Sequence, residues 1–231
     1  MEPRPKTDPL LSALSAPSRE LTERGPDPAR ARVQYRAHAD GYDASARRTM
    51  RLRRRVIALL KLEPGQTVLD VACGTGLSFA WLRAGVGEAG QVIGVELSPD
   101  MLQLARARCE RKGWRNVRLI ESDMASVALP GPLDAILFNF THDVIQSPPA
   151  LERIFAAARP GARIAVAGVK YAPWWLAPLN PLVRVRARPY LTTYAGLDAP
   201  WKPLLEYLDE FQWKSTLFAT GYIGSGTVKR R

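Results

Sequence analysis

The stretch VLDVACGTGLS, from Val68 to Ser78, decides the fold. A run of apolar residues reaches Asp70, and a turn of small residues that contains Gly74 and Gly76 follows it. Glycines let a ligand approach the backbone of such a turn, and the start of the next helix offers free N–H groups. A tight turn alone would explain the glycines but not the acid. The stretch therefore predicts a ligand site at the end of a buried strand.

The turn fits neither of two common phosphate-binding patterns. The third glycine of a dinucleotide-binding G-x-G-x-x-G motif would fall at Phe79, and no Gly-Lys-Ser/Thr sequence completes a P-loop. By itself, the turn indicates a nucleotide-like ligand without specifying which one.

Segments typical of strands and helices alternate on both sides of this turn. Helical periodicity and end signals predict helices over 44–62, 77–84, 98–112 and 147–158, and short apolar runs predict strands over 67–72, 92–96, 117–121, 133–140 and 163–168. Strands separated by helices pair in parallel, with helices on both faces of the sheet. The fold class is therefore α/β, with a doubly wound, mostly parallel sheet.

The two ends of the chain differ from this pattern. Residues 1–30 are rich in proline and charge, which predicts a disordered leader before one domain over 31–231. Residues 171–200 have little periodicity and form an insert, and 204–211 is predicted to be a helix. The last residues read as two strands around a turn near Thr220 and Gly221, which gives a seven-stranded sheet an antiparallel edge hairpin.

Bulk composition narrows the class of protein. No apolar run approaches the ~20 residues of a membrane span, and no signal peptide is evident. Two cysteines, Cys73 and Cys109, give no disulfide framework, so we expect a cytoplasmic protein, and we expect no metal site. The net charge of +11 suits nucleic acid, an anionic membrane or an acidic substrate, but biased composition explains it too. The basic residues are spread along the chain, except in residues 47–55, RRTMRLRRR, where they cluster.

Two further acids follow predicted strands. Glu96 ends the second strand, where a carboxylate can accept hydrogen bonds from both hydroxyls of a ribose and would repel a 2′-phosphate. Asp123 lies two residues past the third strand, where it can accept a bond from an adenine amino group while Met124 packs on the ring. Three acids at three successive strand ends indicate one nucleoside site.

Together, VLDVACGTG, VIGVELSPDML and ESDM resemble the class I, seven-stranded methyltransferases that use S-adenosylmethionine. The resemblance covers residues 35–170 well. It implies that Asp70, Gly74 and Gly76 surround the methionine half of the cofactor, that Glu96 holds the ribose, and that Asp123 and Met124 hold the adenine. Ala72, Leu97 and Asn139 complete the expected cofactor-binding set around these motifs.

The upstream sequence YRAHADGYD is similar to a family segment, Y-D-x-x-A-x-x-Y-D, that forms a helix over the cofactor. Tyr35, Ala39, Tyr42 and Asp43 match it, whereas Arg36 replaces the usual aspartate. Tyr35 and Tyr42 are therefore candidate cofactor-binding residues. Aromatic anchoring of the helix to the core explains them equally well.

The sequence NFTHD, residues 139–143, follows the fourth strand, where this family brings the acceptor to the methyl group. It lacks the Asn/Asp/Ser-Pro-Pro-aromatic motif of relatives that methylate nucleobase amines, so we do not favour a nucleic-acid acceptor. His142 is a candidate general base or acceptor-orienting group, with Asp143 as its partner. Helix capping by His142, and charge compensation by Asp143, are the alternatives.

The 171–200 insert stands where the family builds substrate caps. Trp174, Trp175, Tyr190 and Tyr194 are therefore candidate substrate-binding residues. Together with Arg184, Arg186 and Arg188, the insert can instead contact an anionic membrane, or it can be a packed linker.

The sequence as a whole predicts methyl transfer from S-adenosylmethionine to oxygen or nitrogen of a small or lipid-like acceptor, leaving S-adenosylhomocysteine. Three alternatives stay open. They are an RNA or protein acceptor docked by the basic surface, transfer of the cofactor's aminocarboxypropyl group, and a cofactor-binding module without activity. The oligomeric state is not specified by the sequence.

Overall fold

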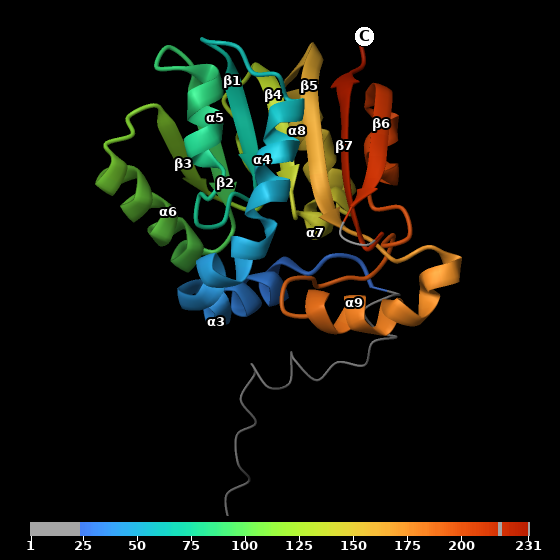
Figure 1. Ribbon diagram of the computed structural model, residues 1–231. Helices are drawn as coiled ribbons and strands as arrows, with labels where there is room; N and C mark the ends of the chain where they lie inside the picture. The colour runs from blue at the N-terminus through green and yellow to red at the C-terminus, as the bar shows by residue number, and fades with distance from the viewer. Residues whose placement is uncertain (1–23, 217–218, 231) are drawn as a thin grey trace, which may run out of the picture.

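The computed structural model describes residues 24–216 and 219–230 and contains one seven-stranded sheet (Figure 1). The strand order is β3-β2-β1-β4-β5-β7-β6, parallel from β3 to β5, with β7 antiparallel to both β5 and β6. The predicted doubly wound sheet with an antiparallel edge hairpin is therefore confirmed. The strands are β1 (Thr67–Val71), β2 (Gln91–Glu96), β3 (Val117–Glu121), β4 (Leu133–Asn139), β5 (Ala158–Val169), β6 (Leu208–Thr216) and β7 (Gly221–Val228).

Helices cover both faces of the sheet because successive strand residues point to opposite sides. In β1, Val68 packs under α4, α5 and α6, whereas Leu69 packs under α7, α8 and η3. The elements are α4 (Met50–Leu59), α5 (Phe79–Val86), α6 (Pro99–Lys112), α7 (His142–Ile145), α8 (Pro148–Ala156) and the 3₁₀ helix η3 (Lys202–Glu206). Two apolar clusters, one on each face, therefore hold the sheet between them.

The remaining helices lie at one end of the sheet. In Figure 1, α3 (Pro28–Ala46) and α9 (Asn180–Ala187) run along the bottom of the molecule, beyond the strands, while the C-terminus lies at the top. The short 3₁₀ helices η1 (Arg47–Thr49) and η2 (Trp174–Leu179) precede α4 and α9. Ligands bind beyond the carboxyl ends of parallel strands where the strand order reverses, which here is between β1 and β4.

Helix α6 shows how local sequence sets these boundaries. Ser98 caps its start, with the side-chain oxygen accepting from the backbone N–H of Met101, and Pro99 occupies the first position. Gly113 ends the helix in the left-handed conformation, with φ at 65°. The helix predicted at 98–112 is thereby confirmed.

Two predictions for the chain ends are corrected. Residues 204–211 are not one helix, because η3 ends at Glu206 and the chain then pairs with β7 as edge strand β6. A short apolar run carries no periodicity that separates a helix from a strand, and tertiary pairing decides. The predicted leader ends too late, since residues 28–30 form the first turn of α3, which Asp27 caps. Residues 1–23 lie outside the described residues.

Candidate active site

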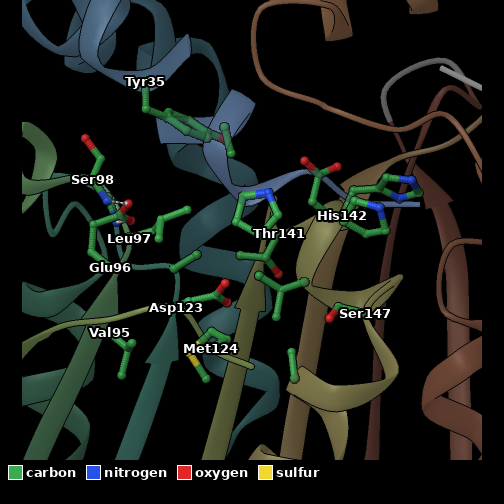
Figure 2. Close-up of a pocket in the computed structure, with 18 of the residues that line it drawn as sticks. Tyr35, Val95, Glu96, Leu97, Ser98, Asp123, Met124, Thr141, His142 and Ser147 are labelled. Carbon is green, nitrogen blue, oxygen red and sulfur yellow. Dashed lines mark hydrogen bonds between the residues drawn. The ribbon is translucent and has the colours of Figure 1, made fainter. Parts of the chain in front are cut away.

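A cavity of about 380 Å³ lies between α3 and the carboxyl ends of the strands. In Figure 2, Glu96, Leu97 and Ser98 lie on one side of it and Thr141 and His142 on the other, with Asp123 and Met124 between and Tyr35 above. Of the predicted site residues, the cavity brings together Tyr35, Tyr42, Asp70, Ala72, Gly74, Glu96, Leu97, Asp123, Met124, Asn139, His142, Asp143 and Tyr190.

The glycine turn is fixed in place by Glu96. One carboxylate oxygen accepts from the backbone N–H of Gly74 at 2.9 Å, and the other accepts from that of Ser98 at 2.8 Å. Gly74 has a φ of 56°, which glycine adopts without strain. Burial raises the pKa of Glu96, while the two backbone donors lower it. Since a carboxylate has about four lone-pair sites, Glu96 keeps capacity for ligand donors.

Close packing behind the turn explains why β2 carries a glycine. A Cβ at Gly94 would lie 2.9 Å from the sulfur of Cys73 and 2.9 Å from the ring of Phe79. The Cys73 side chain therefore fills space under the turn, and burial raises the pKa of its thiol well above the ordinary value. A thiol in this state is a poor nucleophile.

Several buried polar atoms at the cavity have no hydrogen-bond partner within the described chain. They are Oδ2 of Asp70, Oδ1 of Asn139, Oγ1 of Thr141, Nδ1 of His142 and Oδ1 of Asp143. Folded proteins rarely leave buried polar atoms unpaired, because each one costs the hydration it has lost. These atoms are therefore available for hydrogen bonds with a ligand in the cavity.

Asp70 is the most strongly perturbed carboxyl group at the cavity. Burial raises its pKa to about 7, although the Arg53 guanidinium and a hydrogen bond with Ser78 pull it down. Arg53 is itself buried in the wall of the cavity, where its side chain contacts Thr49, Tyr42 and the ring of Phe140. A cationic ligand group would favour the ionised form of Asp70.

A pH dependence of cofactor binding follows from this pKa. If Asp70 faces a positively charged part of the ligand, protonation of the free protein below about pH 7 should weaken binding, approaching tenfold per pH unit. We expect the dissociation constant of S-adenosylmethionine, measured by calorimetry, to rise between about pH 7 and pH 5 in the native protein. Asp70→Asn should bind weakly and show a much flatter profile. Parallel profiles for both proteins would remove Asp70 from the site.

Helix α3 is tied to the glycine turn by a polar cluster. Asp43 accepts from the Thr75 hydroxyl at 2.5 Å and pairs with Arg108, which also donates to the Thr75 carbonyl. Tyr35 donates to the Tyr190 carbonyl at 3.0 Å, so the helix is also joined to the loop after α9. Asp43, which matches the Y-D segment of the family, therefore joins α3 to the glycine turn and does not line the cavity.

The floor of the cavity contains Asp123 and Met124. Asp123 accepts from the backbone N–H of Ala125 at 2.9 Å, which fixes its carboxylate beside Ser122. Met124 is buried against the apolar cluster that includes Val95, so its side chain gives the cavity an apolar surface. A planar, amine-bearing ring fits such a pair.

His142 and Asp143 do not form the expected hydrogen-bonded pair. The Nε2 atom of His142 lies 3.0 Å from the carbonyl of Ala195, which can only accept, so Nε2 carries the proton and Nδ1 presents a lone pair. Burial lowers the pKa of His142 to about 4, so its ring is neutral near pH 7. Asp143 instead accepts two bonds from Thr192, and burial raises its pKa to about 6. The insert therefore positions both residues.

Four predicted site residues do not reach the cavity. Trp174 and Trp175 lie on η2, where their side chains are exposed and do not line the cavity. Tyr194 is buried in a separate apolar cluster with Ala187, and its hydroxyl bonds to the Arg184 carbonyl. Gly76 is a turn residue that does not line the cavity, and a Cβ at this position would clash with the ring of Phe79. Of the predicted substrate-binding set, only Tyr190 lies at the cavity.

Other cavity residues were not predicted. Arg53 lies three residues before Val56, on the apolar side of α4, and that position could have separated it from the exposed arginines around it. Thr192 and residues 25–28 also line the cavity. No local pattern marks them, because they reach it through contacts far along the chain, such as the Asp27 N–H donating to the Thr192 hydroxyl at 2.9 Å.

Part of the chain is similar to known methyltransferases. Residues 68–161 match the family described as "Methyltransferase domain". The demethylmenaquinone methyltransferase of Lactococcus lactis is 31% identical over 107 residues, covering 43% of this chain and 40% of that protein. The nocamycin O-methyltransferase of Saccharothrix syringae is 30% identical over 146 residues, covering 60% and 52%. This chain thus spans about half the length of the curated relatives it matches.

A solved structure extends the likeness to the fold. The SAM dependent methyltransferase from Aquifex aeolicus superposes with a TM-score of 0.61 at 21% identity, over 87% of this chain and 98% of that one. With the strand order and the cavity at its switch point, these matches show the fold of the class I methyltransferases, and residues 68–161 match the methyltransferase family model. The cofactor of this family is S-adenosylmethionine.

The residues at the cavity fit this cofactor. Carboxylates suit a molecule with a sulfonium, an ammonium and ribose hydroxyls, and Asp70 and Glu96 stand at adjacent strand ends. The unpartnered atoms of Asp70 and Asn139 provide sites for its polar groups.

Proposed function

We propose that this protein is an enzyme that transfers the methyl group of S-adenosylmethionine to oxygen or nitrogen of a small or lipid-like acceptor. The observation that carries the proposal is that one cavity joins two chemically different halves. Asp70, Glu96 and Asp123 line the half assigned to the cofactor. The other half has His142 with an unpartnered Nδ1, and Tyr190 and Thr192 from the insert.

Cofactor binding follows the assignment that the family motifs imply. Asp70 and the turn at Gly74 hold the methionine half, Glu96 holds the ribose, and Asp123 with Met124 holds the adenine. Tyr35 and Tyr42 close the cavity from α3. When bound, the cofactor supplies an electrophilic methyl group on a sulfonium.

The protein's own contribution to the reaction is mainly orientation. Holding a nucleophile in line with a reactive carbon can lower a barrier by up to ~10 kcal/mol. The neutral His142 ring accepts a hydrogen bond at Nδ1 from the hydroxyl or amine of the acceptor and so directs its lone pair. Asp143 holds the Thr192 loop against this half of the cavity. Removal of a proton assists only acceptors that are protonated near neutral pH.

A small acceptor is favoured over a macromolecule by the enclosure of the cavity. Residues 25–28, α3 and the Thr192 loop all line the cavity, and a hydrogen bond from the Asp27 N–H to the Thr192 hydroxyl joins two of these segments. The exposed arginines at 47, 48, 51, 54 and 55 lie on η1 and α4 and do not line it. Transfer of the aminocarboxypropyl group from the same cofactor is the second candidate, since the cofactor half would serve both reactions.

The acceptor class is tested by following radiolabel. The purified protein is incubated with methyl-labelled S-adenosylmethionine and separate metabolite, lipid-extract, RNA and protein fractions. We expect label in a small or lipid product that extracts into organic solvent, and about 100-fold slower labelling with His142→Ala at the same enzyme concentration. Label only in RNA or protein would contradict the proposed acceptor. Transfer from carboxyl-labelled but not from methyl-labelled cofactor would identify the aminocarboxypropyl reaction instead.

A further inference from the structure

Exposed apolar side chains gather on one short segment of the surface. In the part of the chain that the structure describes, eight large hydrophobic side chains are exposed, and five of them lie on η2 and α9. The exposed fraction is 85% for Trp174, 63% for Trp175 and 68% for Val185. We call this set the apolar ridge; it comprises Trp174, Trp175, Leu179, Leu182 and Val185.

The ridge belongs to a well-anchored segment, so its exposure is not the result of loose packing. On the inner side, Val183 and Ala187 are buried. Asn180 accepts from the backbone N–H of Ala172 at 2.8 Å, and Arg184 donates to the Tyr171 hydroxyl at 2.8 Å. The inner face therefore holds η2 and α9 in position while the outer face presents apolar groups to the surroundings.

The charged residues of the segment that carries the ridge are all basic. The sequence contains Arg184, Arg186 and Arg188 but no acidic residue from 171 to 197. Arg186 is exposed, and Arg184 is partly exposed with its guanidinium over the Tyr171 ring. Tryptophan and arginine side chains are suited to a bilayer interface, where rings lie at headgroup level and long basic side chains reach the phosphates.

The ridge is adjacent to the cavity. Tyr190 and Thr192 line the cavity and follow α9 directly, and Gln34 of α3 donates to the Arg188 carbonyl. Figure 1 shows α9 beside α3 at the end of the molecule that holds the cavity. A molecular surface that contacts the ridge would therefore lie next to the acceptor half of the cavity.

We propose that the apolar ridge docks the protein on an anionic lipid bilayer, with Trp174 and Trp175 inserted at the interface. Contact is peripheral, because no helix in the described residues is long and apolar enough to cross a membrane. The proposal deepens the proposed function, since it gives a lipid-like acceptor a route from the bilayer to His142.

Vesicle binding tests this surface without cofactor or acceptor. The full chain is sedimented with vesicles of phosphatidylcholine, with and without phosphatidylglycerol. We expect binding to the anionic vesicles that weakens as salt is raised. The double variant Trp174→Ser/Trp175→Ser should bind at least about tenfold more weakly. The matched control Leu104→Ser/Leu205→Ser, which removes exposed apolar groups from α6 and η3, should bind like the native chain.

Three outcomes would overturn the membrane proposal. They are no binding to anionic vesicles, equal loss in both double variants, and a self-association that the tryptophan variant abolishes while vesicle binding is absent. The last outcome would make the ridge an interface between two copies of this chain.

Calorimetry with S-adenosylmethionine on the same proteins separates the membrane proposal from the proposed function. Cofactor binding without vesicle binding refutes only the docking surface, whereas vesicle binding without cofactor binding refutes only the proposed function.

Discussion

Replacing Glu96 with alanine is expected to weaken the binding of S-adenosylmethionine by about 100-fold or more. Hydrogen bonds to a charged group contribute about 1.5–3 kcal/mol each, and the carboxylate is assigned to both ribose hydroxyls. The change also removes the acceptor for the N–H groups of Gly74 and Ser98, so the turn that lines the cavity loses its anchor. Calorimetric titration of native and variant proteins measures the effect.

The neighbouring strand offers a matched control for this variant. Glu121 ends β3 directly opposite Glu96 in the sheet, but its side chain is exposed and does not line the cavity. Glu121→Ala should therefore leave cofactor affinity nearly unchanged. Equal affinities for the native protein and Glu96→Ala, both shown to be folded by circular dichroism, would refute the assignment of the ribose to Glu96.

Replacing His142 with alanine is expected to lower kcat by about 100-fold while changing cofactor affinity little. The ring is assigned to the acceptor half of the cavity, where its unpartnered Nδ1 atom can direct the nucleophile. Turnover with the acceptor found by radiolabelling gives kcat and KM, and calorimetry gives the cofactor affinity. His142→Asn retains an acceptor atom and should recover part of the lost rate.

The other histidine in the described chain provides the control for this prediction. His38 lies on α3 with its Nδ1 atom 2.7 Å from the Gln34 carbonyl and does not line the cavity. His38→Ala should retain most of the native kcat. A loss of cofactor affinity in His142→Ala as large as the loss of rate would show that His142 holds the Ala195 loop in place and has no role toward the acceptor.

Local sequence predicts the parallel part of the fold because each element there has its own signal. The cap at Ser98, the stop at Gly113 and the apolar strands around Asp70 need no distant partner to be recognised. Residues 208–211, the first part of strand β6, were predicted as the end of a helix because their strand conformation depends on pairing with β7, and the outer edge of β6 is open to solvent. Distant contacts, not local preference, fix that segment.

The candidate site likewise has one part that local sequence predicts and another part that depends on distant contacts. Asp70 and Glu96 lie at the ends of strands, and Gly74 and Asp123 come just after strands, so their positions in sequence predict their meeting at one edge of the sheet. The acceptor half depends on loops that meet through bonds spanning more than a hundred residues, such as that from Asp27 to Thr192. Sequence position therefore could not show that Trp174 and Trp175 point away from the cavity.

A crystal structure with S-adenosylhomocysteine tests the central claim most directly. The account predicts the product in the cavity under α3, with its ribose at the Glu96 carboxylate, its adenine between Asp123 and Met124, and its amino-acid end at Asp70. The thioether sulfur should face the His142 half, which leaves room there for an acceptor. Product bound at another place, or bound here with the ribose away from Glu96, would contradict the account.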